Sequence, residues 1–291
     1  MMLRSDLPAS NDDLRAALYA GDVFRLPPSD ASRRVVAASI EAVEGELGAD
    51  MRHAQFRLSD DDFFAAVGRL RKQLYTTEPF HDLLRQMLRD AGFDPARIAF
   101  DPFRLRVVAH KGFENPRAAP IYYAHRDTWY AHSQAEITWW IPLHDVTEAE
   151  TFAFYPDWFA RPVGNNSEEF DHDRWTKHGP SLRIGWQDAR HGKSHLYPGH
   201  VGDLEPGTVV SFAAKEAEVV LFAGSHFHQT RKNSTGRTRF SIDFRSVHLD
   251  DHAAGRGAPN VDNRSTGSAL GDYTTSAREA NTEGRCEDLT P

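Results

Sequence analysis

The chain has 291 residues, 40% hydrophobic and 11% aromatic, which is enough apolar material to exclude a wholly disordered protein. Its formal net charge of −8 disfavours nucleic-acid binding, because proteins that bind phosphate backbones usually carry a basic face. The sequence contains no long apolar run and no apolar segment of a secretory signal, so we expect no membrane span and a cytoplasmic protein. Its single cysteine, Cys286, excludes a disulfide within one chain.

The first third of the sequence has the apolar spacing of helices. Apolar residues recur at helical intervals over residues 31–48, 59–75 and 78–92. The second stretch opens with Ser59 and Asp62 in a capping-box arrangement, and the third stops at Gly92. We therefore expect residues 1–95 to form a helical scaffold that covers another layer.

From about residue 100 the pattern changes to short stretches rich in β-branched and aromatic residues. The predicted strands cover residues 103–109, 121–125, 136–143, 151–155, 208–212, 219–222 and 238–247. Many short strands indicate a sandwich or barrel, so we expect a mainly β fold with N-terminal helices. Residues 100–250 would form this core, and residues 156–200 would interrupt it as a long loop or lid.

The segment after residue 250 has a different composition. Residues 251–291 are polar and rich in glycine and serine, and we expect roughly the last 20 of them to be disordered. The chain shows no internal repeat, and residues 1–291 are expected to form a single domain.

A histidine and a carboxylate stand two positions apart in the aromatic segment YYAHRDTWY, residues 122–130. If this segment is extended, His125 and Asp127 project to one face, while Arg126 points away and forms a surface ion pair. An imidazole and a carboxylate on one face suit Fe(II), Mn(II) or Zn(II). Alone, the pair is weak evidence for a metal, because a surface His–Asp pair has the same pattern.

A third ligand is available downstream, where a hydrophobic strand ends in the sequence HFH. His226 and His228 would point the same way in a strand, so either could complete the 2-His-1-carboxylate set of non-haem Fe(II) oxygenases. Arg239 lies eleven residues after His228, and Ser241 shares its strand face. A buried arginine beside a hydroxyl would bind a distal carboxylate, so this pattern fits a site for 2-oxoglutarate.

These motifs resemble the phytanoyl-CoA-hydroxylase-like branch of the Fe(II)/2-oxoglutarate dioxygenases, in particular bacterial small-molecule hydroxylases. The resemblance covers roughly residues 100–247 and rests on the order and spacing of HRD, WIPL and HQTRKNSTGRTR. In that family the distal histidine precedes an asparagine by five residues and the arginine that binds the cosubstrate by eleven. His228, Asn233 and Arg239 match both intervals, which favours His228 over His226 as the ligand.

The resemblance implies a double-stranded β-helix, the cupin-like jelly roll, that uses Fe(II), 2-oxoglutarate and O₂. It implies the metal ligands His125, Asp127 and His228, and the cosubstrate contacts Arg239, Ser241 and Trp140. Halogenating relatives replace the carboxylate ligand by a small residue, so Asp127 favours hydroxylation, with desaturation or ring closure as variants. One departure is the segment AETFAFYPDWFARPV, residues 149–163, which leaves the substrate-side loop unassigned.

Further residues are candidates for substrate contact: Arg104, Arg106, Arg161, Arg245, His226 and Trp129. The arginines favour an anionic group on a diffusible small molecule, such as an amino-acid derivative or a natural-product intermediate. Each candidate has an ordinary alternative. Arg104 and Arg106 could face solvent, Arg245 could pair with Asp243, and Trp129 could serve only in packing.

The sequence therefore favours an enzyme that hydroxylates an unactivated C–H bond of a small molecule, with no nucleic-acid or membrane partner. The alternative is a cupin-like isomerase, hydrolase or binding module that holds a metal without 2-oxoglutarate. Such a protein would keep the three metal ligands but would have no need of Arg239 and Ser241 in register. A non-enzymatic scaffold with coincidental histidines is a third possibility.

Overall fold

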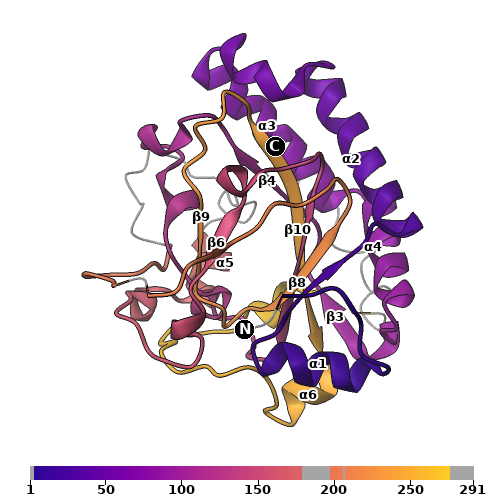
Figure 1. Ribbon diagram of the computed structural model, residues 1–291, viewed down its shortest axis with the longest axis vertical. Helices are drawn as coiled ribbons and strands as arrows, with labels where there is room; N and C mark the ends of the chain where they lie inside the picture. The colour runs from indigo at the N-terminus through magenta and orange to yellow at the C-terminus, as the bar shows by residue number, and fades with distance from the viewer. Residues whose placement is uncertain (1–2, 179–196, 206, 276–291) are drawn as a thin grey trace.

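The computed structural model describes residues 3–178, 197–205 and 207–275 (Figure 1). The strands are β1 (Leu3–Arg4), β2 (Val23–Leu26), β3 (Ile98–Phe100), β4 (Arg104–Val108), β5 (Glu136–Pro142), β6 (Phe152–Phe154), β7 (Val210–Ser211), β8 (Val219–Ala223), β9 (His228–Thr230) and β10 (Arg239–His248). The α-helices are α1 (Asn11–Tyr19), α2 (Asp30–Leu47), α3 (Asp60–Thr76), α4 (Glu78–Asp90), α5 (His172–His178) and α6 (Leu249–Ala253). Short 3₁₀ helices, among them η4 (Ala119–Tyr122) and η5 (Asp127–Tyr130), occupy several connections.

The strands form two sheets. The larger has the order β1-β2-β8-β5-β10-β3, and β4 also pairs with β10. Only the β1–β2 pair in this sheet is parallel; the other pairs between these strands are antiparallel. The smaller sheet has the order β7-β6-β9 and is antiparallel. The expectation of sheets combined with N-terminal helices is confirmed in outline.

Helices α1 to α4 cover one face of the larger sheet, and the smaller sheet packs on the other (Figure 1). Alternation along β5 places two neighbouring tryptophans in these two cores. Trp139 stacks on Phe244 on the helical side, with ring centroids 5.2 Å apart. Trp140 makes an edge-to-face contact of 5.4 Å with Phe152 of the smaller sheet. The central strands are buried on both faces, which explains their nearly continuous apolar sequences.

The two ends of the chain depart from the prediction. Residues 1–95 are not only a helical scaffold, because β1 and β2 extend the larger sheet and β2 pairs with β8. The polar segment after residue 250 packs on the core as far as it is described. Tyr273 is buried, and Thr274 exchanges two backbone hydrogen bonds with Phe100. Most of the segment expected to be disordered, residues 276–291, lies outside the described residues.

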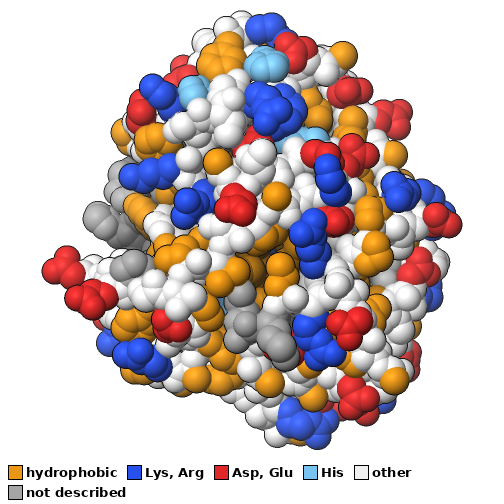
Figure 2. Space-filling view, in the orientation of Figure 1, with side chains coloured by type: hydrophobic (Ala, Val, Ile, Leu, Met, Phe, Trp, Pro, Cys, Tyr) orange, Lys and Arg blue, Asp and Glu red, His pale blue; other side chains and the backbone are white. Residues whose placement is uncertain are grey.

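The predicted interruption at residues 156–200 is only partly described, since residues 179–196 lie outside the described ranges. Its first part contains α5 and short 3₁₀ turns. None of the described helices is long and apolar enough to cross a membrane. On the face drawn in Figure 2, basic and acidic side chains are interspersed rather than gathered into single-sign patches.

Candidate metal centre

The three predicted ligands come from two neighbouring segments. His125 lies in the loop after η4, Asp127 begins η5, and His228 begins β9. His125 and His228 form an isolated antiparallel bridge and exchange two backbone hydrogen bonds of 3.0 Å. The predicted strand over residues 121–125 is not formed: residues 121–122 belong to η4, and the backbone is extended at Tyr123 and Arg126 before η5 begins at Asp127. The backbone pairing with β9 brings His228 to the other two ligands.

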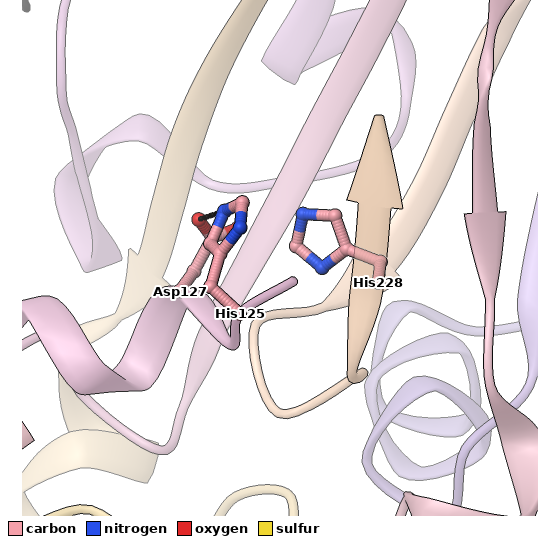
Figure 3. A group of neighbouring side chains, drawn as sticks. All are labelled: His125, Asp127 and His228. Carbon is pink, nitrogen blue, oxygen red and sulfur yellow. Dashed lines mark ion pairs between the residues drawn. The ribbon is translucent and has the colours of Figure 1, made fainter. Parts of the chain in front are cut away.

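The three side chains face one another across a small gap (Figure 3). One potential ligand atom from each of them lies within 4.8 Å of the other two. The His125 Nε2 and Asp127 Oδ1 atoms are 3.8 Å apart, and the two imidazole centroids are 4.4 Å apart. Among the described residues this is the one group of histidine, cysteine and acidic side chains close enough to hold a metal ion.

Backbone carbonyls orient both imidazoles. His125 Nδ1 donates to the carbonyl of Tyr123 at 2.8 Å, and His228 Nδ1 donates to that of His226 at 2.9 Å. A carbonyl can only accept, so each Nδ1 carries the proton and each Nε2 presents a lone pair to the gap. Such contacts to the second ring nitrogen are typical of metal-binding histidines.

The electrostatics keep the three groups in the protonation states that a metal needs. Burial, and next the neighbouring His228, lower the pKa of His125 to about 3. Burial also lowers the pKa of His228. For Asp127, burial opposes ionisation, but Arg245 and the two histidines outweigh it and hold the carboxyl pKa well below its usual range. The centre therefore offers two neutral imidazoles and one carboxylate at neutral pH.

Two further side chains fix the carboxylate of Asp127. Its Oδ2 accepts from Thr138 Oγ1 at 2.8 Å, and its Oδ1 accepts from Arg245 Nη2 at 3.0 Å. Arg245 also forms an ion pair of 3.4 Å with Asp101. The predicted pairing of Arg245 with Asp243 is not formed; instead, Arg245 supports the candidate metal ligand.

Glu136 is a buried carboxyl group that sequence reasoning missed. Thr138 Oγ1 lies 2.6 Å from Glu136 Oε1 as well as 2.8 Å from Asp127 Oδ2. One hydroxyl proton cannot serve both oxygens, so a neutral Glu136 must donate to the hydroxyl that donates to Asp127. Burial, with Asp127 nearby, raises the pKa of Glu136 well above its usual range. Gly224 makes room for this group, because a Cβ there would lie 1.9 Å from Glu136 Oε2.

Arg126 lies between two of the ligands but does not form the surface ion pair that was predicted. Its side chain is buried, and its Nε donates to Asp262 Oδ2 at 3.1 Å. The guanidinium also donates to the carbonyls of Trp158 at 2.6 Å and Arg161 at 2.8 Å. Trp129 Nε1 donates to the other oxygen of Asp262 at 2.8 Å. Asp262, in the C-terminal segment, thus fixes the loop that carries His125 and Asp127. Sequence reasoning missed it, because a single acidic residue in a polar segment has no distinguishing pattern.

A second polar group consists of Arg239, Trp140 and Ser241; Arg239 and Trp140 line the same cavity, whereas the fully buried Ser241 is not among its lining residues. Trp140 Nε1 donates to Ser241 Oγ at 3.0 Å, and Arg239 Nη1 donates to the same oxygen. Ser241 Oγ therefore accepts twice and retains its own proton to donate. Arg239 is buried, which lowers its pKa to about 10, and among the described residues it forms no ion pair with a carboxylate. Such a guanidinium favours an anion in the cavity.

The cavity that joins these groups has a volume of about 210 Å³. Its walls include the three candidate ligands, Trp140 and Arg239. The substrate candidates Arg104, Arg106 and Arg245 also line it, whereas His226, Trp129 and Arg161 are not among its lining residues.

Two of these substrate candidates, Arg104 and Arg106, form ion pairs with acidic residues. Arg104 pairs with Asp101 at 2.9 Å, and Arg106 pairs with Asp243 at 2.5 Å. The remaining candidates lie elsewhere. Trp129 and His226 are buried in aromatic packing, and the Arg161 guanidinium lies over the Trp158 ring at 4.5 Å. Sequence reasoning missed further lining side chains, namely Arg71, Tyr75, Tyr130, His132, Trp175 and Tyr197.

No family model matches the sequence, and no curated protein matches it. Several solved structures resemble the fold weakly. EvdO2 from Micromonospora carbonacea var. aurantiaca, complexed with 2-oxoglutarate, has a TM-score of 0.47 and 12% identity over 85% of this chain and 94% of that chain. The apo form of the non-heme monooxygenase ThoJ has a TM-score of 0.44 and 11% identity over 84% and 85%. The non-heme alpha-ketoglutarate-dependent epimerase SnoN from nogalamycin biosynthesis has a TM-score of 0.40 and 13% identity over 90% and 96%.

Because these TM-scores lie below 0.5, what those proteins bind does not carry over to this chain. The phytanoyl-CoA-hydroxylase-like assignment stays a prediction. The function has to be inferred from the residues that line the cavity.

Proposed function

We propose that the protein is an Fe(II)- and 2-oxoglutarate-dependent oxygenase that hydroxylates a C–H bond of a small molecule. One observation carries the proposal: a buried group of two histidines and one carboxylate shares a cavity with a buried arginine that has no acidic partner among the described residues. We also propose that the two facing sheets are the double-stranded β-helix implied by the motifs.

The donor set fits the proposed metal. Two neutral imidazoles and one carboxylate are the facial ligands of non-haem Fe(II) oxygenases, and they leave positions open for other ligands. His125, Asp127 and His228 would hold the ion, with Nε2 as the ligand atom of each histidine. When bound, iron supplies the oxidative chemistry, in which 2-oxoglutarate and O₂ are consumed and the substrate is oxidised.

The protein's own residues perform the binding and positioning. Arg239 would bind the distal carboxylate of 2-oxoglutarate because it brings a guanidinium to the cavity wall, and Ser241, whose Oγ accepts from Arg239 and keeps its own proton, would assist it. Thr138 and Arg245 hold Asp127 in one orientation. The aromatic walls, including Trp140 and Phe152, exclude water from the reacting centre.

The alternative is a cupin-like metal protein that does not use 2-oxoglutarate. Anaerobic addition of Fe(II) and then 2-oxoglutarate to the full chain separates the two. The proposed enzyme should develop a weak visible charge-transfer band that depends on both additions. Asp127→Asn should lose the band, whereas Asp250→Asn, at an exposed ion pair with Arg97, should keep it. Iron binding without a band in the wild type would favour the alternative.

A further inference from the structure

A second cavity lies beside the metal cavity, between α3 and the loop that leads to the metal ligands. Its volume is about 470 Å³, within the range of roughly 300–1,000 Å³ that is typical of small-molecule sites. Its walls combine apolar and charged side chains. The apolar ones include Phe63, Phe64 and Val67 from α3, and Ala118, Ile121 and Tyr122 from the loop; the charged ones, besides Arg71, are Asp60, Lys111, Glu114 and Arg117. The metal cavity, at about 210 Å³, is smaller than that range and would also have to hold 2-oxoglutarate.

The two cavities adjoin one another. Arg71, Val107 and Ile121 line both of them, so they meet where α3 crosses the end of β4. The shared lining places the second cavity directly beside the metal cavity, within reach of a molecule whose other end lies at the metal.

The junction between the cavities is cationic. Arg71 Nε donates to the carbonyl of Leu105 at 3.1 Å, which fixes the stem of the guanidinium at the boundary. Burial, and next the charge of Arg106, lower the pKa of Arg71 to about 10, while Tyr197 and Asp243 act in the opposite direction. Arg106 directs its Nε to Asp243, on the metal side. An anionic group at this junction would add a charge-assisted contact to the Arg71 guanidinium, which lines both cavities.

We infer that the second cavity binds the apolar part of the substrate, and that an anionic group of the same molecule lies at Arg71. This inference rests on the proposed function and specifies its substrate class: an amphipathic small molecule whose oxidised end lies in the metal cavity. An anionic group on the substrate suits Arg71 at the boundary of the cavities, and an apolar group suits Phe63 and Phe64 in the second cavity. The sequence had suggested an anionic substrate, but it had not identified Arg71 or this cavity.

A matched pair of fluorescent dyes tests the inference on the metal-free full chain. The probes are 8-anilinonaphthalene-1-sulfonate and neutral N-phenyl-1-naphthylamine, which share an aromatic framework and differ in the sulfonate. Wild type should bind both. Arg71→Gln should weaken binding of the anionic dye by about 10- to 100-fold, as expected for loss of a charge-assisted contact, and change the neutral dye less than about twofold. Arg69→Gln, on the same helix but at an exposed ion pair with Glu46, should change neither.

Filling the cavity gives the second arm of the test. Ala118→Trp should reduce binding of both dyes by about tenfold or more, because the indole would occupy the apolar space. Ala109→Phe, at another wall position, replaces it if thermal unfolding shows that Ala118→Trp does not fold. Undiminished binding of both dyes by a folded, filled variant would overturn the inference, as would equal weakening of both dyes by Arg71→Gln.

The anaerobic band with Fe(II) and 2-oxoglutarate separates this inference from the proposed function. The wild type and the control Arg69→Gln should both develop it, because Arg69 forms an exposed ion pair with Glu46 and belongs to neither the metal nor the cosubstrate group. A normal band with failed dye predictions would overturn the substrate assignment alone. An absent band in the wild type would overturn the proposed function and, with it, this substrate assignment, even if both dyes bind as expected.

Discussion

Arg126 and Asp262, separated by 136 positions in the sequence, form a buried ion pair at 3.1 Å directly behind the candidate metal centre. Arg126 lies between His125 and Asp127, so the pair fixes the backbone from which both ligands project. Asp262 also accepts from Trp129 and from the backbone N–H of Val163. One carboxylate in the C-terminal segment therefore joins the ligand loop to the segment after β6.

Asp262→Ala should strongly destabilise the metal-free protein. Removal of one partner leaves the Arg126 charge buried, which costs about 3–5 kcal/mol of unfolding free energy. Asp250→Ala removes the acidic partner of the exposed pair with Arg97 and should lower the unfolding free energy much less, because solvent screens that pair. Urea unfolding of both variants measures this difference. Equal destabilisation would contradict a special role for Asp262.

The two histidines of the HFH sequence should behave differently on substitution. His228→Gln should abolish metal-dependent succinate formation and weaken metal binding by at least about tenfold, because the Nε2 ligand is lost. His226→Gln should retain metal binding, since the carbonyl rather than the side chain of His226 orients His228. Metal titration with circular dichroism as a folding control measures both. Loss of the metal by His226→Gln alone would reverse the ligand assignment.

Arg239→Ala should raise the 2-oxoglutarate requirement with little change in iron binding. Loss of a buried charge-assisted pair costs about 2–5 kcal/mol of binding free energy, and each 1.4 kcal/mol is a tenfold change in affinity. The 2-oxoglutarate concentration for half-saturation should therefore rise by about two orders of magnitude. Arg237→Ala, two residues earlier and half exposed, is the matched control. Titration of 2-oxoglutarate into the Fe(II)-loaded proteins gives the comparison. Coincident curves for Arg239→Ala and wild type would remove Arg239 as the carboxylate anchor.

Glu136→Gln should stabilise the metal-free protein at neutral pH. The folded-state pKa of Glu136 lies above its unfolded value, so its contribution is fully present below the unfolded carboxyl pKa and is lost as pH rises through the folded pKa. Glutamine keeps a donor for Thr138 without this loss. Unfolding free energies of variant and wild type should therefore agree near pH 4 and diverge as pH rises. A constant difference at every pH would show that Glu136 does not carry the proton.

The metal-free protein should lose stability in acid through His125 and His226. Burial lowers the pKa of each to about 3, below the unfolded value of about 6.5, so their contribution is present above pH 6.5 and is lost as pH falls towards 3. Each contributes a slope of about 1.4 kcal/mol per pH unit in that window. His226→Phe should remove one of the two slopes. An unchanged pH dependence of unfolding would contradict a buried neutral His226.

Local sequence patterns determined much of this protein. Apolar periodicity identified α2, α3 and α4, because one-sided burial imposes a period on the sequence. The principal strands of the larger sheet were identified instead by their β-branched and aromatic residues. His125 and Asp127 followed from their side-chain chemistry and short spacing, whereas the choice of His228 over His226 rested on the family resemblance. Arg239 and Ser241 could be paired because residues two apart on a strand share a face, and both lie in β10.

Only the tertiary structure decided which charges are partners. Arg126 was expected at the surface because a strand was predicted, but the chain turns into η5 at Asp127 and buries it against Asp262. Glu136 and Thr138 gained their roles from Gly224, which lets another strand end approach them closely. Arg71 reached the cavity through the packing of α3 on β4. These relationships depend on contacts between residues far apart in the sequence, and no local periodicity encodes such contacts.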